Sequence, residues 1–281
     1  MKDKKVLIIG GAGFLGKRIL HFLEEEGCNC YYADLQPIFG LNDTYISLNA
    51  LSNTNFSKLD TDFDVVVNLT GQVSNPSNLC LQLNTEGINN IINFVNLSNA
   101  KLIQVSTLSV YGSSLQEVDE NSPLNPETTY GSLKSISEYL LKNKLSEKKY
   151  AVIRLSNLYG DMQPKGIMSY LLRSVKNNDD IFFNNDGSLK RHYLNVDDAA
   201  IMIVKMCLQF NCGTYNYPGS DLYSIKELIS LLEEISSKKF IVNYQNVKSW
   251  ENLEKLNSSK IIDTFKYVPQ KLLKTWLTKQ L

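Results

Sequence analysis

The chain has 281 residues, with 29 basic and 29 acidic side chains and therefore no net charge. This balance gives no reason to expect nucleic acid or an anionic membrane surface as a partner, and no apolar run approaches the roughly 20 residues that span a bilayer. A hydrophobic fraction of 43% is typical of a globular protein.

The first 34 residues contain a recognisable order of elements. The apolar run 6–9 predicts a buried strand, the glycine-rich stretch 10–16 a turn, and the apolar residues with helical spacing a helix that begins at Phe14. A second strand, 29–33, leads to Asp34. This strand–turn–helix–strand–acid order predicts a site for a dinucleotide.

Each glycine of the turn has its own expected role. Gly10 permits the tight bend, Gly13 lets the backbone approach a pyrophosphate, and Gly16 lets the helix and the strand pack closely. Phe14 and Leu15 begin the helix, where free N–H groups and the positive end of the helix dipole would face the phosphates. The spacing between the first two of these glycines, Gly10 and Gly13, is one residue longer than in G-x-G-x-x-G. The alternative interpretation is a turn with a purely structural role.

Asp34 indicates which dinucleotide binds. A carboxylate at this position can accept two hydrogen bonds from the adenosine ribose and would repel a 2′-phosphate, so NAD is favoured over NADP. No arginine lies between Arg18 and Arg154 to hold a 2′-phosphate. The alternative is a solvated residue that closes the strand.

Further along, strand-like runs alternate with helical patterns. Strands are predicted at 45–48, 64–69, 102–105 and 151–153, and helices at 81–97 and 130–145. The run 64–69 lacks polar alternation, as in strands that are buried on both faces. Repeated strand–helix units of this kind predict an α/β fold with a doubly wound parallel sheet and right-handed crossovers.

The second half breaks this rhythm. Helices are predicted at 167–175, 197–210 and 224–235, and extended segments at 181–183 and 240–244. Ser224 and Glu227 have the spacing of a capping box. We expect a cofactor-binding domain at 1–156, to which about 190–212 return, and a smaller substrate-binding lobe made mainly from 157–281.

Thr107, Tyr130 and Lys134 are the candidate catalytic residues. Tyr130 and Lys134 are four residues apart, so a helix places both on one face. A nearby ammonium and an oxidised nicotinamide would lower the pKa of Tyr130, which would then exchange a proton with a carbinol or ketone as hydride moves. Thr107, just past a strand, would hold the same oxygen, and Lys134 would also hold the ribose of the nicotinamide nucleoside.

The Tyr-x-x-x-Lys spacing alone carries little weight, since it occurs by chance. The chain contains it at Tyr130/Lys134, Tyr244/Lys248 and Tyr267/Lys271. Only the first opens a predicted helix after a strand that carries Thr107, downstream of the glycine turn. For the other two we favour surface or core roles, and a chance helix-face pair is the alternative for the first.

The five cysteines are odd in number and scattered, which indicates reduced thiols of a cytoplasmic protein. Cys28-x-Cys30 has neither a metal-binding nor a redox spacing. Because His21 and His192 are the only histidines, no metal site is expected.

Together these motifs make the chain similar to the extended short-chain dehydrogenases/reductases, in the NAD-dependent nucleotide-sugar epimerase/dehydratase family. The resemblance covers residues 4 to about 230 and implies a Rossmann fold. The stretches that carry it are 10–16, 34, 64–71, 106–112, 130–134, 154–160 and 191–198.

The resemblance implies further cofactor contacts. Leu69, Thr70 and Gly71 would line the dinucleotide, Asn84 would lie near its ribose, and Asn49 would lie by the adenine. It also implies a homodimer in which the helices 81–97 and 130–145 pack across a two-fold axis.

The resemblance also implies a substrate site for a nucleotide-activated sugar. Asn157 and Arg191 would face its diphosphate, for which a forked, permanently charged guanidinium is well suited. A structural ion pair of Arg191 with Asp197 or Asp198 is the alternative. Arg154 is expected to be structural.

Two features depart from the family pattern. The family's 4,6-dehydratases place an Asp-Glu pair directly after the catalytic Thr, where this chain has Leu108 and Ser109, which argues against dehydration. The segments 71–84 and 160–166, which border the substrate cleft, are shorter than is usual in the family.

The favoured hypothesis is therefore an NAD-dependent nucleotide-sugar 4-epimerase with Tyr130 as acid and base. The alternative within the family is an NAD(P)H-dependent reductase of nucleotide-4-keto-6-deoxysugars. A non-catalytic dinucleotide sensor on the same fold is a third hypothesis, from another class.

Overall fold

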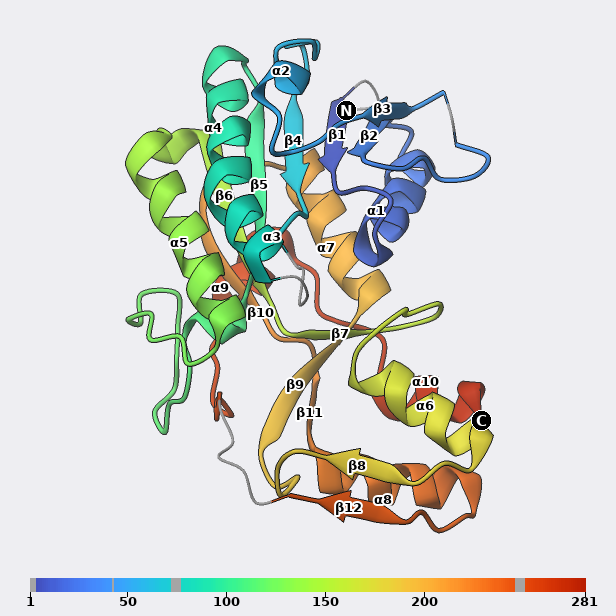
Figure 1. Cartoon of the computed structure of the whole chain (residues 1–281). Helices are drawn as coiled ribbons and strands as arrows, with labels where there is room; N and C mark the ends of the chain where they lie inside the picture. The colour runs from blue at the N-terminus through green and yellow to red at the C-terminus, as the bar shows by residue number, and fades with distance from the viewer. Residues whose placement is uncertain (1–3, 42, 72–76, 246–250) are drawn as a thin grey trace.

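The computed structural model describes residues 4–41, 43–71, 77–245 and 251–281 (Figure 1). A seven-stranded sheet with the order β10-β6-β5-β4-β1-β2-β3 fills the upper part of Figure 1, and every neighbouring pair in it is parallel. Its strands are β1 (Lys5–Ile9), β2 (Asn29–Asp34), β3 (Tyr45–Ser47), β4 (Val65–Asn68), β5 (Lys101–Thr107), β6 (Tyr150–Leu155) and β10 (Gly213–Tyr217).

The strand order confirms the doubly wound α/β fold. The chain runs outward from β1 through β2 to β3, returns to the other side of β1 with β4, and continues outward through β5 and β6. The order therefore reverses between β1 and β4, and in sheets of this kind ligands bind at the carboxyl ends of the strands beside that reversal.

Helices cover both faces of the sheet (Figure 1). On one face lie α1 (Phe14–Glu25) and α7 (Val196–Leu208), and on the other α4 (Ile88–Leu97) and α5 (Thr129–Lys144). Alternate residues of β1 serve the two layers: Val6 and Ile8 pack toward α1 and α7, and Leu7 and Ile9 toward α4. This alternation is why β1 is an uninterrupted apolar run.

The smaller part of the molecule lies at the carboxyl edge of this sheet (Figure 1). It holds a three-stranded sheet of the order β11-β9-β7 and a two-stranded sheet of β12 and β8. Their bounds are β7 (Asn157–Tyr159), β8 (Ile181–Phe183), β9 (Lys190–Asn195), β11 (Asp221–Ser224) and β12 (Val242–Tyr244). A separate hydrophobic cluster joins these strands to α6 (Ile167–Asn177), α8 (Ile225–Ser236) and α10 (Leu273–Gln280).

The remaining helices are short: α2 (Asn53–Phe56), α3 (Ser77–Gln82) and α9 (Ser259–Phe265). Ser224 caps α8 in the predicted capping box with Glu227. Within the residues that the structure describes, no helix is both long and apolar enough to cross a bilayer.

Several features of the fold differ from the sequence-based expectation, among them the strands β7, β9 and β11, which were not predicted. The predicted helix 81–97 is interrupted by a π-helical turn, Leu83–Gly87, between α3 and α4. The seventh strand of the central sheet, β10, was not predicted; it follows α7 and pairs with β6. The chain therefore leaves the central sheet at β7 and returns to it after β9.

The glycine turn is packed too closely for side chains. The N–H of Gly10, at φ +83°, donates to Ala33 O at 2.8 Å. A Cβ built on Gly16 would lie 2.4 Å from Gly11 O and 2.6 Å from Gly11 Cα, and one built on Gly11 would lie 2.5 Å from Tyr32 Cβ. Gly16 thus has the predicted packing role, and Gly11, which sequence reasoning passed over, has a similar one.

We expect Gly16→Ala to lower the free energy of unfolding by about 2–3 kcal/mol, because the added methyl group meets backbone that cannot move aside. Gly87→Ala is the matched control, since Gly87 has helical φ and ψ and its added Cβ would meet nothing closer than 3.6 Å. Denaturant unfolding of both variants tests this. Equal stabilities for the two would show that the turn has room to spare.

Candidate active site

The glycine turn and Asp34 meet at the carboxyl ends of β1 and β2. One carboxylate oxygen of Asp34 accepts from the Ala12 N–H at 3.0 Å and the other from the Leu35 N–H at 2.7 Å. The side chain of Asp34 therefore faces the turn and is more than a solvated residue at the end of a strand. This is where the expected adenosine ribose would have to lie.

The N-terminus of α1 is open to an anion. Gly13 is its N-cap, no side chain caps it, and its first turn, which includes Phe14 and Leu15, holds no acidic residue. A Cβ built on Gly13 would meet only Gly10 O, at 3.2 Å, so the backbone is uncovered on its other side. Free N–H groups at the positive end of a helix dipole suit a pyrophosphate.

The segment Leu69-Thr70-Gly71 lies directly beside this turn. The Leu69 N–H donates to Ile9 O at 2.9 Å, and a Cβ built on Gly10 would lie 3.4 Å from Leu69 Cβ. The hydroxyl of Thr70 donates to Asn68 Oδ1 at 2.8 Å. The structure thus brings this predicted cofactor segment to the expected place.

Asn84 holds Gly71 in position. Its carboxamide nitrogen donates to Gly71 O at 3.0 Å and to Cys80 O at 2.8 Å, and its oxygen accepts from the Ser137 hydroxyl at 2.9 Å. Only 2% of the residue is exposed. The π-helical turn carries this side chain, a feature often found at functional sites, and the contact with ribose stays a prediction.

Asn49 lies at the neighbouring end of β3. The preceding Leu48 N–H donates to Asp34 O at 3.0 Å, and Asn49 Oδ1 accepts from the Leu51 N–H at 3.0 Å. The residue is exposed. Its position next to Asp34 is compatible with the predicted contact with adenine.

The three candidate catalytic residues lie at the ends of β5 and α5. Thr107 ends β5, and its Oγ1 accepts from the Ser109 N–H at 3.2 Å. The ammonium of Lys134 donates to Thr70 O at 2.8 Å and to Val105 O at 3.1 Å. Tyr130, one helical turn earlier, is half-buried, and its hydroxyl makes no hydrogen bond within the part of the chain that the structure describes.

The electrostatics of Tyr130 differ from the expectation. Burial raises the pKa of Tyr130, and the neighbouring Cys80 and Glu251 act in the same direction. Burial also lowers the pKa of Lys134 to about 8. In the chain alone, loss of hydration therefore dominates, and the expectation that the ammonium and an oxidised nicotinamide together lower the pKa of Tyr130 stays a prediction for the complex.

A buried ion pair anchors α5 to the sheet. Arg154 on β6 reaches Glu138 on α5 through Nη2 at 2.6 Å and Nε at 3.1 and 3.2 Å, and it also donates to the Tyr111 hydroxyl. The Ser106 hydroxyl donates to Glu138 as well. Arg154 is structural, as predicted. Glu138, four residues after Lys134, shares its face of α5.

The proposed substrate residues come from two neighbouring strands. The carboxamide of Asn157 on β7 donates to His192 O on β9 at 3.1 Å, and Arg191 immediately precedes His192. Both lie in the three-stranded sheet, next to the carboxyl edge of the central sheet (Figure 1). The structure therefore brings Asn157 and Arg191 together.

The carboxylates considered as partners of Arg191 bind other groups. Asp197 pairs with Arg18 and Lys271. Asp198 accepts from the Tyr267 hydroxyl at 2.5 Å and from the Lys271 N–H at 2.8 Å.

These contacts also give the Tyr267/Lys271 pair a structural role, since both residues tie the C-terminal segment to α7. In the remaining Tyr-x-x-x-Lys match, Tyr244/Lys248, the lysine lies outside the described residues. Residues 72–76 of the short segment 71–84 also lie outside them.

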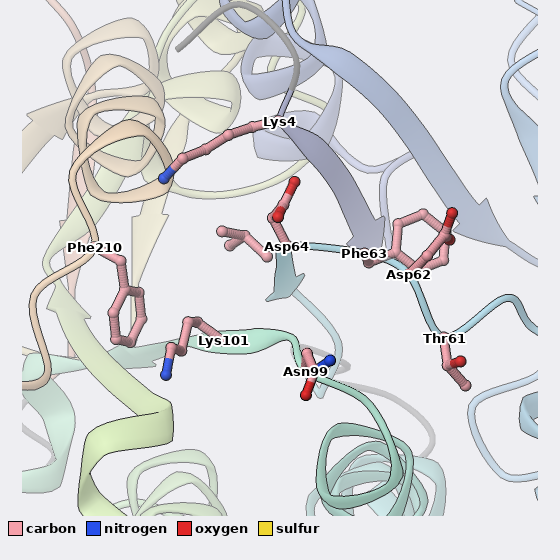
Figure 2. Close-up of a pocket in the computed structure, with 9 residues that line it drawn as sticks. Lys4, Thr61, Asp62, Phe63, Asp64, Asn99, Lys101 and Phe210 are labelled. Atoms are coloured by element: carbon pink, nitrogen blue, oxygen red, sulfur yellow. The ribbon is translucent and has the colours of Figure 1, made fainter.

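A surface hollow of about 540 Å³ lies at the opposite, amino-terminal edge of the central sheet. Figure 2 shows the ammonium groups of Lys4 and Lys101 on the side of Phe210, with Asp62 across from them. None of the predicted site residues lines this hollow. Because doubly wound sheets bind ligands at their carboxyl ends, we do not assign the active site to it.

A family model described as the NAD dependent epimerase/dehydratase family matches residues 6–216. The human dTDP-D-glucose 4,6-dehydratase is 28% identical over 273 residues, which cover 86% of this chain and 77% of the human protein.

Among solved structures, dTDP-glucose 4,6-dehydratase from Bacillus anthracis in complex with NAD superposes with a TM-score of 0.87, at 22% identity and over 99% of this chain and 95% of that chain. UDP-glucuronic acid 4-epimerase from Bacillus cereus, in complex with UDP-glucuronic acid and NAD, superposes with a TM-score of 0.84 at 24% identity. The match covers 97% of this chain and 96% of that chain. Both show the same fold.

The buried Lys134 gives a pH-dependent prediction. Its pKa is lowered from 10.5 to about 8 in the folded chain, so between these values the unfolded state binds more protons and stability rises with pH. We expect the free energy of unfolding of the unmodified chain, relative to Lys134→Met, to increase from about pH 7 to about pH 10. Denaturant unfolding at each pH measures it.

The control is Lys142→Met, at an exposed lysine of the same helix. The difference in the free energy of unfolding between the unmodified chain and this variant should stay constant over the same pH range. A pH-independent difference for Lys134→Met would contradict the prediction.

Proposed function

The chain belongs to the NAD-dependent epimerase/dehydratase family, and we propose that it is a nucleotide-sugar 4-epimerase that transiently oxidises a sugar carbon. NAD is the cofactor of this enzyme family. The observation that supports the proposal is the position of Tyr130 and Lys134. Lys134 binds the carbonyl of Thr70, beside the glycine turn, and Tyr130 lies one helical turn away with its hydroxyl available.

The residues present fit NAD. The turn at Gly10 and Gly13 and the open N-terminus of α1 would hold its pyrophosphate, Asp34 would hold the adenosine ribose, and Lys134 the other ribose. When bound, NAD would supply the hydride acceptor and, in its reduced form, the hydride donor for the sugar.

Tyr130 and Thr107 would act on the sugar oxygen. Because Thr107 Oγ1 accepts a hydrogen bond from Ser109 N–H, its own proton remains to be donated to a substrate oxygen. Tyr130 would take the proton from that oxygen during oxidation and return it during reduction. Asn157 and Arg191 would bind the diphosphate of the nucleotide.

Dehydration is not proposed, although several relatives are 4,6-dehydratases. Elimination of water needs an acid and a base beside the sugar. Leu108 is apolar and 6% exposed, and Ser109 is neutral. Neither can replace the carboxyl pair that the dehydratases of the family use at these positions.

A nucleotide-4-keto-sugar reductase is the second candidate. Burial raises the pKa of Tyr130 and so favours the protonated phenol, which is the form that gives a proton to a ketone. Asp34 favours NAD, which suits a cofactor that stays bound through an epimerase cycle. Reversible turnover without added cofactor would support the epimerase, and stoichiometric consumption of NAD(P)H would support the reductase.

We also propose a homodimer in the cytoplasm. The outer face of α5 exposes 38% of Ile136 and 66% of Tyr139, and nearby α3 and α4 expose 46% of Leu81 and 83% of Leu97. Such apolar side chains on adjacent helices suit a contact with a second copy. All five cysteines are free thiols, as in proteins of a reducing compartment.

Tyr130→Phe tests the proposed function. After a screen of nucleotide sugars and their 4-keto forms has found a substrate, we expect the variant to lose roughly 10²- to 10⁴-fold in turnover while it binds NAD as before. Tyr139→Phe, at an exposed tyrosine of the same helix, should keep full turnover. A Tyr130→Phe chain with unchanged turnover would exclude Tyr130 as the acid and base of either proposed enzyme, whereas the absence of turnover with every compound of the screen would leave the sensor.

A further inference from the structure

The segment 251–257 comes from far along the chain and is joined to the loop between β5 and α5. Leu253 forms a bridge with Ser114, and Leu256 forms one with Val118. The Ser114 N–H donates to Asn252 O at 2.8 Å. This segment is therefore fixed against the loop that leads from Thr107 to Tyr130.

Glu251 has an unusual backbone conformation in this segment. Its φ is +65°, which side chains with a Cβ rarely adopt and which costs about 1 kcal/mol or more. Two contacts hold it there. Its N–H donates to Glu127 Oε2 at 2.7 Å, and its carboxylate accepts from the Thr128 hydroxyl at 2.8 Å.

Thr128 connects Glu251 to the helix that carries the site. Thr128 is the N-cap of α5, and its Oγ1 accepts from the Gly131 N–H at 3.2 Å. A chain of two hydrogen bonds thus runs from Gly131 through Thr128 to Glu251, past Tyr130. A carboxylate at the N-terminus of a helix also interacts favourably with the helix dipole.

We propose that Glu251 is a positioning residue that fixes the first turn of α5 and keeps the phenol of Tyr130 in its protonated, proton-donating form. The inference rests on the proposed role of Tyr130 as acid and base. It adds a carboxylate to a site whose positions after Thr107 hold none.

The charges around Tyr130 support this assignment. Burial is the largest cause that raises its pKa, and Cys80 of α3 and Glu251 act in the same direction. Cys80 also acts on Lys134 of α5. Cys80 is a thiol that donates to Gly71 O at 3.3 Å. Glu127 lies in the same network, where its carboxylate accepts from the Ser113 hydroxyl and from Glu251 N–H. Glu251 thus acts on Tyr130 from outside α5.

The test measures the titration midpoint of the phenol at position 130 directly. Tyr130 is replaced by 3,5-difluorotyrosine, because its more acidic phenol titrates at a pH at which the chain is still folded. Its ¹⁹F resonance is followed against pH in the full chain with NAD. Because Glu251→Gln keeps an acceptor for Thr128 and removes one negative charge, the midpoint should move to lower pH. Glu254→Gln removes a charge from an exposed site three residues away and should leave the midpoint in place.

An unchanged midpoint in Glu251→Gln, or an equal shift in both variants, would overturn the proposal. If Glu251→Gln does not fold, Glu251→Gly is measured in its place, because glycine adopts the positive φ without strain. It should show the same downward shift as Glu251→Gln.

Turnover separates this inference from the proposed function. In the oxidation direction, below the inflection of the pH profile, Glu251→Gln should be roughly three- to tenfold faster than the unmodified chain. If Tyr130→Phe retains turnover, the proposed function fails, whatever the ¹⁹F titration shows. If the titration does not move while Tyr130→Phe is inactive, only the role of Glu251 fails.

Discussion

The buried ion pair between Glu138 and Arg154 is the constraint on which the candidate site depends. Both side chains are shielded from water, and an ion pair in such a place must stay intact, since loss of one partner leaves an unpaired charge at a cost of about 3–5 kcal/mol. The pair fixes the rotation of α5 against β6. Lys134 and Tyr130, one and two turns before Glu138, are thereby directed to the carboxyl edge of the sheet, where Lys134 binds the ends of β4 and β5.

The same edge collects groups of different kinds. The N-terminus of α1 provides uncapped backbone N–H groups, Asp34 provides a carboxylate, and the segment after β4 lies between them and α5. The smaller sheet brings Asn157 and Arg191 to the other side. In the proposed function, a diphosphate and a redox-active ring bind at different parts of this edge, and such a division would let one fold support several sugar reactions.

Most of the central sheet could be predicted because its inner strands are buried on both faces and form uninterrupted apolar runs, as in 65–67. Its strand β10, with the sequence GTYNY, has no such run and was missed. β9, with the sequence KRHYLN, has no such pattern and escaped prediction. Local order was enough to single out the glycine turn, Asp34 and Tyr130 as candidates, and their roles stay predictions. Features of the site were missed where distant residues meet: Glu251 contacts Thr128 across 123 positions, and the burial that raises the pKa of Tyr130 exists only in the folded chain.

The most direct measurement is a crystal structure of the chain with NAD and a nucleotide sugar. We expect the Tyr130 hydroxyl to lie within hydrogen-bonding distance of the reacting sugar oxygen, Lys134 to contact the ribose next to the nicotinamide, and the Phe14 and Leu15 N–H groups at the start of α1 to face the pyrophosphate. A complex in which the phenol points away from the nicotinamide, or in which the glycine turn touches no part of the dinucleotide, would contradict this view of the molecule.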